Sequence, residues 1–146
     1  MTTAVTVIVL SLNYTYAQPS GQGDIPTALA VLQGKADQAQ PRDRCFLYAE
    51  LVSRLTDLAG WQFNSGDSVQ ASETLKLVQR YAEKIHMGVA GNSKKIKDAE
   101  VLMQRTSFRL KDILGDASYE DRKALQATLK QLDQVQAQLM MQVFKQ

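Results

Sequence analysis

The chain has 146 residues, 45% of them hydrophobic and 22% charged, which suits one globular domain with a modest core of its own. Its 17 basic and 15 acidic residues leave a net charge of +2, too small to make nucleic acid or an anionic membrane an obligate partner. Three prolines, a 7% aromatic share and abundant Ala, Leu, Gln and Lys favour helix over sheet, so we expect an all-α protein.

The chain starts with an uncharged stretch, MTTAVTVIVLSLNYTYA, that has the pattern of a secretory signal. An apolar run from Ala4 to Leu12 leads into Thr15-Tyr16-Ala17, where small residues stand at the two positions that a signal peptidase reads. The pattern lacks a Lys or Arg near its start, and a membrane anchor or a buried strand are the alternatives. The apolar run is shorter than the roughly 20 residues of a spanning helix. We therefore expect a signal peptide over residues 1–17, and a periplasmic or secreted protein with no stable membrane anchor after cleavage.

A polar linker, residues 18–23, separates this signal from a single helical domain over residues 24–146. Asp24 can cap a first helix that has Pro26 in its first turn, and Gly34 weakens the middle of that helix. Its weak apolar face consists of Ala28, Leu29, Val31, Leu32, Ala36 and Ala39.

The widest apolar face of the chain belongs to the stretch from Asp43 to Phe63. We expect this stretch to form a central helix that begins at Pro41 and ends at the turn signal Asn64-Ser65-Gly66. At about 100° per residue the face covers an arc of roughly 160°, wide enough for two neighbouring helices. We expect Glu50 and Ser53 on the opposite, exposed arc. The apolar arc comprises Cys45, Leu47, Tyr48, Leu51, Val52, Leu55, Leu58, Ala59 and Phe63.

Three further amphipathic helices follow. The first is capped by Asp67 or Ser68 and ends at Gly88 or Gly91; the second begins near Asn92 and ends at Gly115; the last is capped by Ser118. Their short connections predict two antiparallel hairpins, and hence a four- or five-helix up-and-down bundle. The apolar seams are Ala71, Leu75, Val78, Ala82, Ile85 and Val89; then Ile96, Ala99, Met103, Thr106, Leu110 and Ile113; then Leu125, Leu129, Leu132, Val135, Leu139 and Val143, with Met140 as a core filler.

The hairpin from Leu55 to Ala82 resembles part of a tetratricopeptide repeat. It departs from that pattern at Gln62, where an aromatic residue is usual, and no second copy follows at the family's period. Because such repeats need about three stacked units, a plain helical hairpin is the better interpretation. The matching small and large positions are Leu58, Ala59, Gly66, Ala71, Leu75 and Val78.

No catalytic or metal-ligating constellation is apparent. The single cysteine, Cys45, cannot close an internal disulfide and is expected to be buried. The single histidine, His86, stands beside Met87, a pair that could ligate haem or copper, but no further ligand follows at a fixed spacing. We expect no enzymatic activity, no metal and no cofactor, with a ligand- or haem-binding periplasmic bundle as the alternative.

Three lysines, Lys94, Lys95 and Lys97, follow a helix start, where free backbone N–H groups favour anions. No aromatic side chains interleave with them as a stacking platform for nucleic acid would require. We interpret them as a solvated helix end rather than a nucleic-acid site.

Four apolar residues fall on otherwise polar helix faces. Phe46 and Trp61 lie on the helix that begins at Pro41, and Val101 and Phe108 lie on the helix that begins near Asn92. Either a neighbouring helix covers them or they form a surface for a protein partner or for self-association, since exposed aromatic residues among charges are typical of binding hot spots. They are the candidate partner surface.

Two segments, DRCFLYAELV (43–52) and LQATLKQLDQV (125–135), resemble a family of small exported helical proteins of acidobacteria-like soil bacteria. The resemblance extends from Asp43 to Phe144. It implies export and a helical fold but no activity, and it assigns no functional residue. Together with the missing catalytic motif, it favours an exported, non-enzymatic protein-interaction module.

Overall fold

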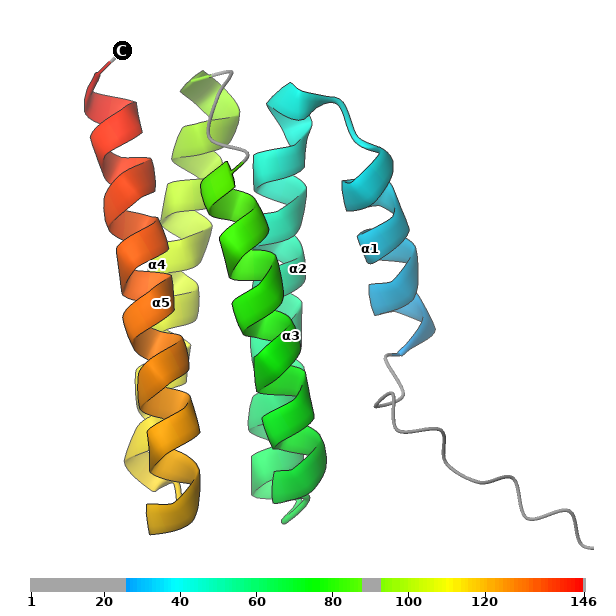
Figure 1. Cartoon of the computed structure of the whole chain (residues 1–146), viewed down its shortest axis with the longest axis vertical. Coiled ribbons are helices and arrows are strands. Elements are labelled where there is room, and N and C mark those ends of the chain that lie inside the picture. The colour runs from blue at the N-terminus through cyan, green and yellow to red at the C-terminus, as the bar shows by residue number, and fades with distance from the viewer. Residues whose placement is uncertain (1–25, 88–92, 146) are drawn as a thin grey trace, which may run out of the picture.

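The computed structural model describes residues 26–87 and 93–145, and within these ranges it contains five helices and no strand (Figure 1). The predicted signal peptide and linker, Asp24 and Val89 lie outside the described residues. The all-α fold predicted from the sequence is confirmed. The helices are α1 (Thr27–Gln38), α2 (Pro41–Asn64), α3 (Ser68–Met87), α4 (Ser93–Asp116) and α5 (Tyr119–Phe144).

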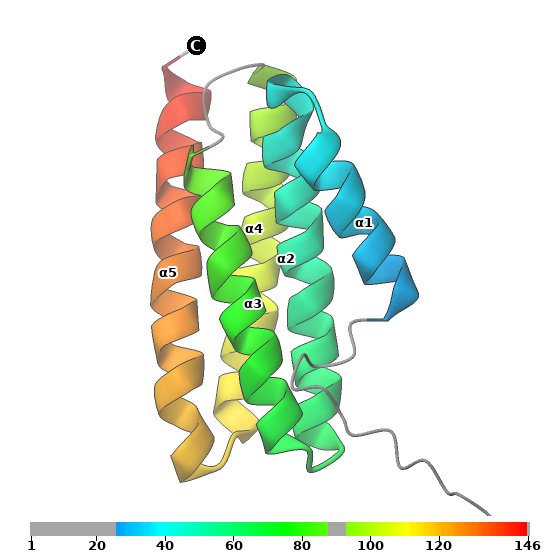
Figure 2. The same cartoon turned by 45° about the vertical axis from the view of Figure 1, so that its right-hand side comes forward.

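Helices α2 to α5 form a four-helix bundle in which α2 packs against α3 and α4, and α5 packs against the same two helices. Chain direction reverses at each step, so α2–α3 and α4–α5 are antiparallel hairpins, while α2 and α4 run parallel (Figures 1 and 2). Although α3 and α4 are consecutive, they occupy diagonal corners, and none of their described Cα atoms approach within 8 Å. The predicted bundle of two hairpins is confirmed.

The helix ends follow local rules. Pro41 occupies the first turn of α2, where its missing N–H costs no hydrogen bond. The α2–α3 turn passes through Gly66 at φ +79°, a left-handed conformation that favours glycine, and the Asp67 carboxylate then accepts a hydrogen bond from the Gln70 N–H at 3.2 Å. The hydroxyl of Ser118 accepts from the Asp121 N–H at 3.3 Å at the start of α5. Both predicted caps are confirmed.

The predicted apolar seams make up most of the core. Several predictions about single residues are wrong: Ser53 is only 5% exposed, Met140 is exposed rather than a core filler, and Ala28 and Val31, predicted on the apolar face of α1, are exposed. Ser53 lies on the side of α2 that packs against α4, where it has a hydrogen-bond partner. The largest fully buried aliphatic side chains are Leu51, Leu55, Leu75, Ile85, Met103, Leu110, Leu125, Leu132 and Leu139.

Helix α1 packs mainly against α2, and it buries Leu29 and Ala36. At its end a polar cluster joins three helices: the Tyr48 hydroxyl donates to Asp37 Oδ1 at 2.8 Å, and Lys84 Nζ donates to the same oxygen at 3.0 Å. Lys84 lies 5.1 Å from the Tyr48 ring centroid and 5.2 Å from that of Tyr81, and the two rings stack. We call Asp37, Tyr48, Tyr81 and Lys84 the α1 latch.

The α1 latch changes the ionisation of its members. The hydrogen bond from Lys84 is the main cause that lowers the pKa of Asp37, and the same bond raises the pKa of Lys84. Burial is the main cause that raises the pKa of Tyr48. The α1 latch therefore favours an ionised Asp37–Lys84 pair beside the neutral phenol of Tyr48.

Candidate functional site

The interface between α2 and α4 sets the geometry of the candidate partner surface. Gly60 lets the helices approach closely, because a Cβ atom at this position would lie 2.8 Å from Ile113 Cδ1. One turn earlier, Arg109 bonds from α4 to two residues of α2: its Nη2 donates to Ser53 Oγ at 2.6 Å, and its Nη1 donates to Asp57. The two helices are thus fixed in register.

Trp61 and Phe108 lie on the outer faces of these two helices and remain 67% and 59% exposed. Trp61 follows Gly60, which packs on Ile113, so Trp61 lies near the level of Leu114. That level is six residues past Phe108, or about 9 Å along the axis at 1.5 Å per residue. The two exposed rings therefore lie on adjacent helices, almost two turns apart along the axis.

Helix α1 does not cover Trp61. At about 1.5 Å per residue, its 12 residues reach only half the length of α2, and they run beside the N-terminal half (Figure 1). Trp61 lies in the opposite half, near the C-terminal end of α2.

Phe46 and Val101 are half-buried, unlike the two exposed rings. Phe46 packs against the hydrophobic core, and Lys95 Nζ from α4 lies 4.9 Å from its ring centroid. For Phe46, a bundle neighbour supplies much of the cover that the sequence left undecided. Partner binding by any of the four residues stays a prediction.

The cysteine is poorly placed for chemistry. Cys45 is 2% exposed, and burial raises the pKa of its thiol to about 11. The predicted burial is confirmed. The side chains of His86, Met87 and Lys94 lie outside the described residues, so the candidate haem pair is untested. Within ranges 26–87 and 93–145, no group of three or more His, Cys, Asp or Glu residues is arranged to hold a metal.

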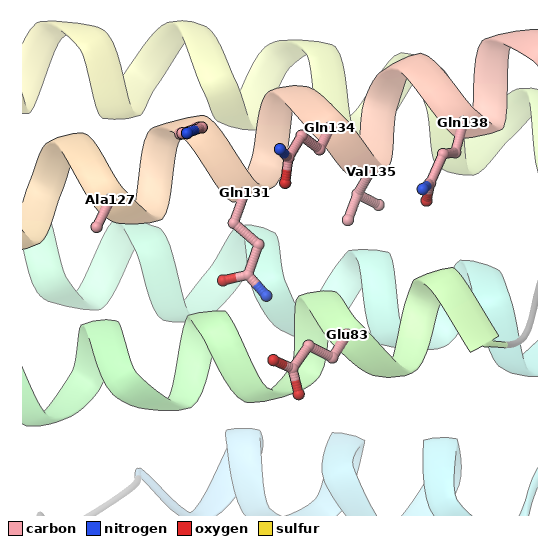
Figure 3. Close-up of a pocket in the computed structure, with 7 residues that line it drawn as sticks. Glu83, Ala127, Gln131, Gln134, Val135 and Gln138 are labelled. Atoms are coloured by element: carbon pink, nitrogen blue, oxygen red, sulfur yellow. The ribbon is translucent and has the colours of Figure 1, made fainter.

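A groove of about 450 Å³ runs between α3 and α5 (Figure 3). Two side-chain amides join α3 and α5 beside the groove. Gln131 Nε2 donates to the backbone carbonyl oxygen of Gln79 at 2.9 Å, and Gln79 Nε2 donates to Thr128 Oγ1 at 2.7 Å. A second hollow lies on the other side of α5 and is lined by α5 alone. The groove is lined by Glu83, Ala127, Lys130, Gln131, Gln134, Val135 and Gln138.

The sequence did not predict these hollows, because most of their lining residues are polar and none belongs to a catalytic motif. The available signal was the spacing of small and uncharged residues along the outer face of α5. Among the described helices, none combines the length and apolar character needed to cross a membrane.

Comparison of the chain with protein-family models, curated proteins and solved structures gives no match. The resemblance to small exported helical proteins, and the partial one to a tetratricopeptide hairpin, therefore stay predictions.

Proposed function

We propose that the protein is an exported, non-enzymatic protein-interaction module that binds its partner through the outer face of α2 and α4. The observation that carries the proposal is the exposure of Trp61 and Phe108, about 9 Å apart along the axis, on two helices fixed in register by Arg109.

These two rings have the properties of binding hot spots. Trp is the residue type most enriched at such positions, and a ring on a rigid helix loses little conformational entropy on binding. Charged side chains surround the rings, including Asp57, Arg109 and Lys111, whose Nζ lies 5.4 Å from the Phe108 ring centroid. The partner expected from this arrangement is a protein with apolar pockets inside a polar rim.

Capture from a periplasmic fraction tests the proposal. The bait is the mature protein, beside a double variant, Trp61→Ala with Phe108→Ala. Tyr119→Ala is the control, because Tyr119 is an even more exposed aromatic residue, at the start of α5. We expect a partner that is retained by the native chain and the control and lost by the double variant. Equal retention by all three baits would contradict the proposed surface.

The visible absorption spectrum of the purified protein tests the alternative, a haem-binding bundle. We expect no absorption band at visible wavelengths. A Soret band that disappears in His86→Ala would instead support a haem-binding bundle.

Export is tested by the mass of the mature protein. We expect removal of residues 1–17, so that Gln18 becomes the N-terminus of the exported form. An exported form that retains Met1 would contradict the proposed signal peptide.

A further inference from the structure

The outer face of α5 carries a second heptad stripe, opposite the one that fills the core. The core stripe repeats every seven residues at Leu125, Leu132 and Leu139, which are fully buried. The outer stripe alternates steps of three and four and consists entirely of exposed residues. Its members are Ala127, Lys130, Gln134, Ala137, Met141 and Phe144.

We propose that this stripe is a self-association surface on which α5 pairs antiparallel with α5 of a second copy of the chain. The proposal goes beyond the partner surface on α2 and α4 and does not depend on it, because the stripe lies on a different helix. No described helix covers the stripe, since α5 packs only against α3 and α4.

The first argument is size complementarity across a two-fold axis. When the axis passes between Gln134 and Ala137, two of the three kinds of layer pair an alanine with a larger side chain, and the third pairs two unbranched side chains of similar size. Ala127 faces Phe144 of the second copy, and Phe144 is 82% exposed in the single chain. The stem of Lys130 lies against Met141, and Gln134 faces Ala137. Such layers can close without gaps, as knobs-into-holes packing requires.

The second argument is charge. Lys130 is the only charged residue of the stripe. In the antiparallel pair it faces a methionine, and the two lysines stand eleven residues apart along the axis, or about 17 Å. That separation exceeds the Debye length of about 8 Å at physiological ionic strength. In a parallel pair the two lysines would meet in one layer, and two alanines would meet in another. Both repulsion and poor packing therefore disfavour the parallel arrangement.

The shape of the surface favours a second helix on one side of the stripe. The groove between α3 and α5 lies there, and Ala127, Lys130 and Gln134 are among its lining residues. Figure 3 shows Ala127 and Gln134 among the α5 side chains that line this groove. A second helix laid along the stripe can place flanking side chains in it.

The area of the contact sets the expected strength. Residues 127–144 span about 26 Å at 1.5 Å per residue. One helix face of this length offers less than the roughly 800 Å² per partner of a standard interface. We therefore expect a reversible dimer whose population rises with protein concentration.

Disulfide trapping tests the register. Cysteines more than about 7 Å apart at Cα cannot be bridged. Lys130→Cys and Met141→Cys proteins are therefore oxidised separately and as a mixture, with Gln104→Cys on the outer face of α4 giving the background rate. We expect a cross-linked product in the mixture that joins one chain of each variant, and only background in each variant alone. Self-cross-linking of each separate variant would show a parallel pair, and background in all samples would show no pair; either result overturns the proposal.

Sedimentation velocity over a concentration series tests the pair without cross-linking. Ala137→Glu should weaken dimerisation at least about tenfold, because a large charge replaces the small residue in the central layers. Ala30→Glu, the same change at an exposed site of α1, should leave it unaltered, as should Trp61→Ala with Phe108→Ala. A native chain that stays monomeric at every concentration, or a dimer that survives Ala137→Glu, would overturn the proposal. Neither result would bear on the proposed partner surface of α2 and α4.

Discussion

Helices α1 and α2 are neighbours in the chain but belong to the fold in different ways. The 24 residues of α2 include eleven buried ones and contact α1, α3 and α4, whereas the 12 residues of α1 include two buried ones and pack against α2, with a single ion pair to α3. The width of the apolar arc explains the difference, because a wide arc can serve several neighbours and a narrow one only one. The position of a helix in this bundle is set by that arc.

The polar contacts also hold α2 more firmly than α1. Two polar residues of α2 are buried with partners on other helices: Thr74 donates from α3 to Gln62 at 2.7 Å, and Arg109 donates from α4 to Ser53 at 2.6 Å. On α1 the main polar contact is Asp37 in the α1 latch, which is partly exposed. A partly exposed ion pair is worth about 1 kcal/mol or less, so α1 should be held less firmly than its neighbour.

The largest expected effect comes from shortening the side chains at the centre of the α2 arc. Leu51→Ala and Leu55→Ala each remove buried methyl groups and leave a cavity that a packed bundle closes only in part. We expect each to lower the free energy of unfolding by about 2 to 5 kcal/mol in urea melts. The same kind of truncation on α1, Leu32→Ala, should cost less, because Leu32 is only partly buried.

Glu50→Ala is the control on the same helix. Glu50 is half-buried and bonds to Arg54 on its own helix at 3.1 Å, a surface pair that contributes little. We expect a change of about 0.5 kcal/mol. Losses at Glu50 as large as those at Leu51 and Leu55 would contradict the assignment of the α2 arc.

The seams of the bundle could be predicted from the sequence because burial on a long helix follows its 3.6-residue period. Ser53 shows where that reasoning stops. Its side chain points toward α4, and its burial depends on Arg109, 56 residues further along the chain. Sequence periodicity reports the apolar arc but cannot report a polar partner on another helix. Gly60, buried against Ile113, was missed for the same reason.

The candidate surface was predicted in part. The helical phase alone places Trp61 and Phe108 on outer faces, and both are exposed. The partial cover of Phe46 required knowledge of where Lys95 on α4 comes to lie. The outer stripe of α5 gave no hydrophobic signal, since four of its six residues are Ala, Lys or Gln.

The second prediction compares thiols on the two helices. Burial raises the pKa of Cys45 from its usual 9.0 to about 11, which lowers its thiolate fraction near pH 8 by about 100-fold. We expect Cys45 to react with a thiol reagent at least about 100-fold more slowly than a cysteine introduced at the exposed Lys35 of α1. Labelling is followed in the native state by mass spectrometry. Equal rates would show that Cys45 is accessible.

The third prediction concerns the α1 latch. Asp37→Ala removes the acceptor shared by Tyr48 and Lys84, and we expect amide hydrogen exchange in α1 to accelerate by a factor that corresponds to about 1 kcal/mol, with exchange in α3 to α5 unchanged. Uniform acceleration in all helices would contradict the weaker attachment of α1.

The pH dependence of the same exchange follows from the lowered pKa of Asp37. Because its pKa lies below the usual 3.8, the carboxylate stabilises the docked α1 above that pH. The stabilisation should be lost as the pH falls below about 4, when the carboxylate is protonated. In Asp37→Ala this acid-dependent change should be absent from α1.

The last and smallest prediction uses one glycine in each helix. A Cβ added at Gly34 of α1 would have no atom within 4 Å, whereas one at Gly60 of α2 would lie 2.8 Å from Ile113 Cδ1. Alanine is better than glycine in a helix by up to about 1 kcal/mol, so Gly34→Ala should stabilise α1 by close to that amount.

At Gly60 the collision with Ile113 opposes the same gain, so Gly60→Ala should stabilise α2 less or destabilise it. Ile113→Val removes the colliding Cδ1 atom, and in that background Gly60→Ala should recover part of the gain. Urea melts and amide exchange in the substituted helix measure each effect. Equal gains at the two glycines, independent of Ile113, would show that α2 has as much free space around it as α1. That result would contradict the contrast between α2, which packs against three helices, and α1, which packs mainly against one.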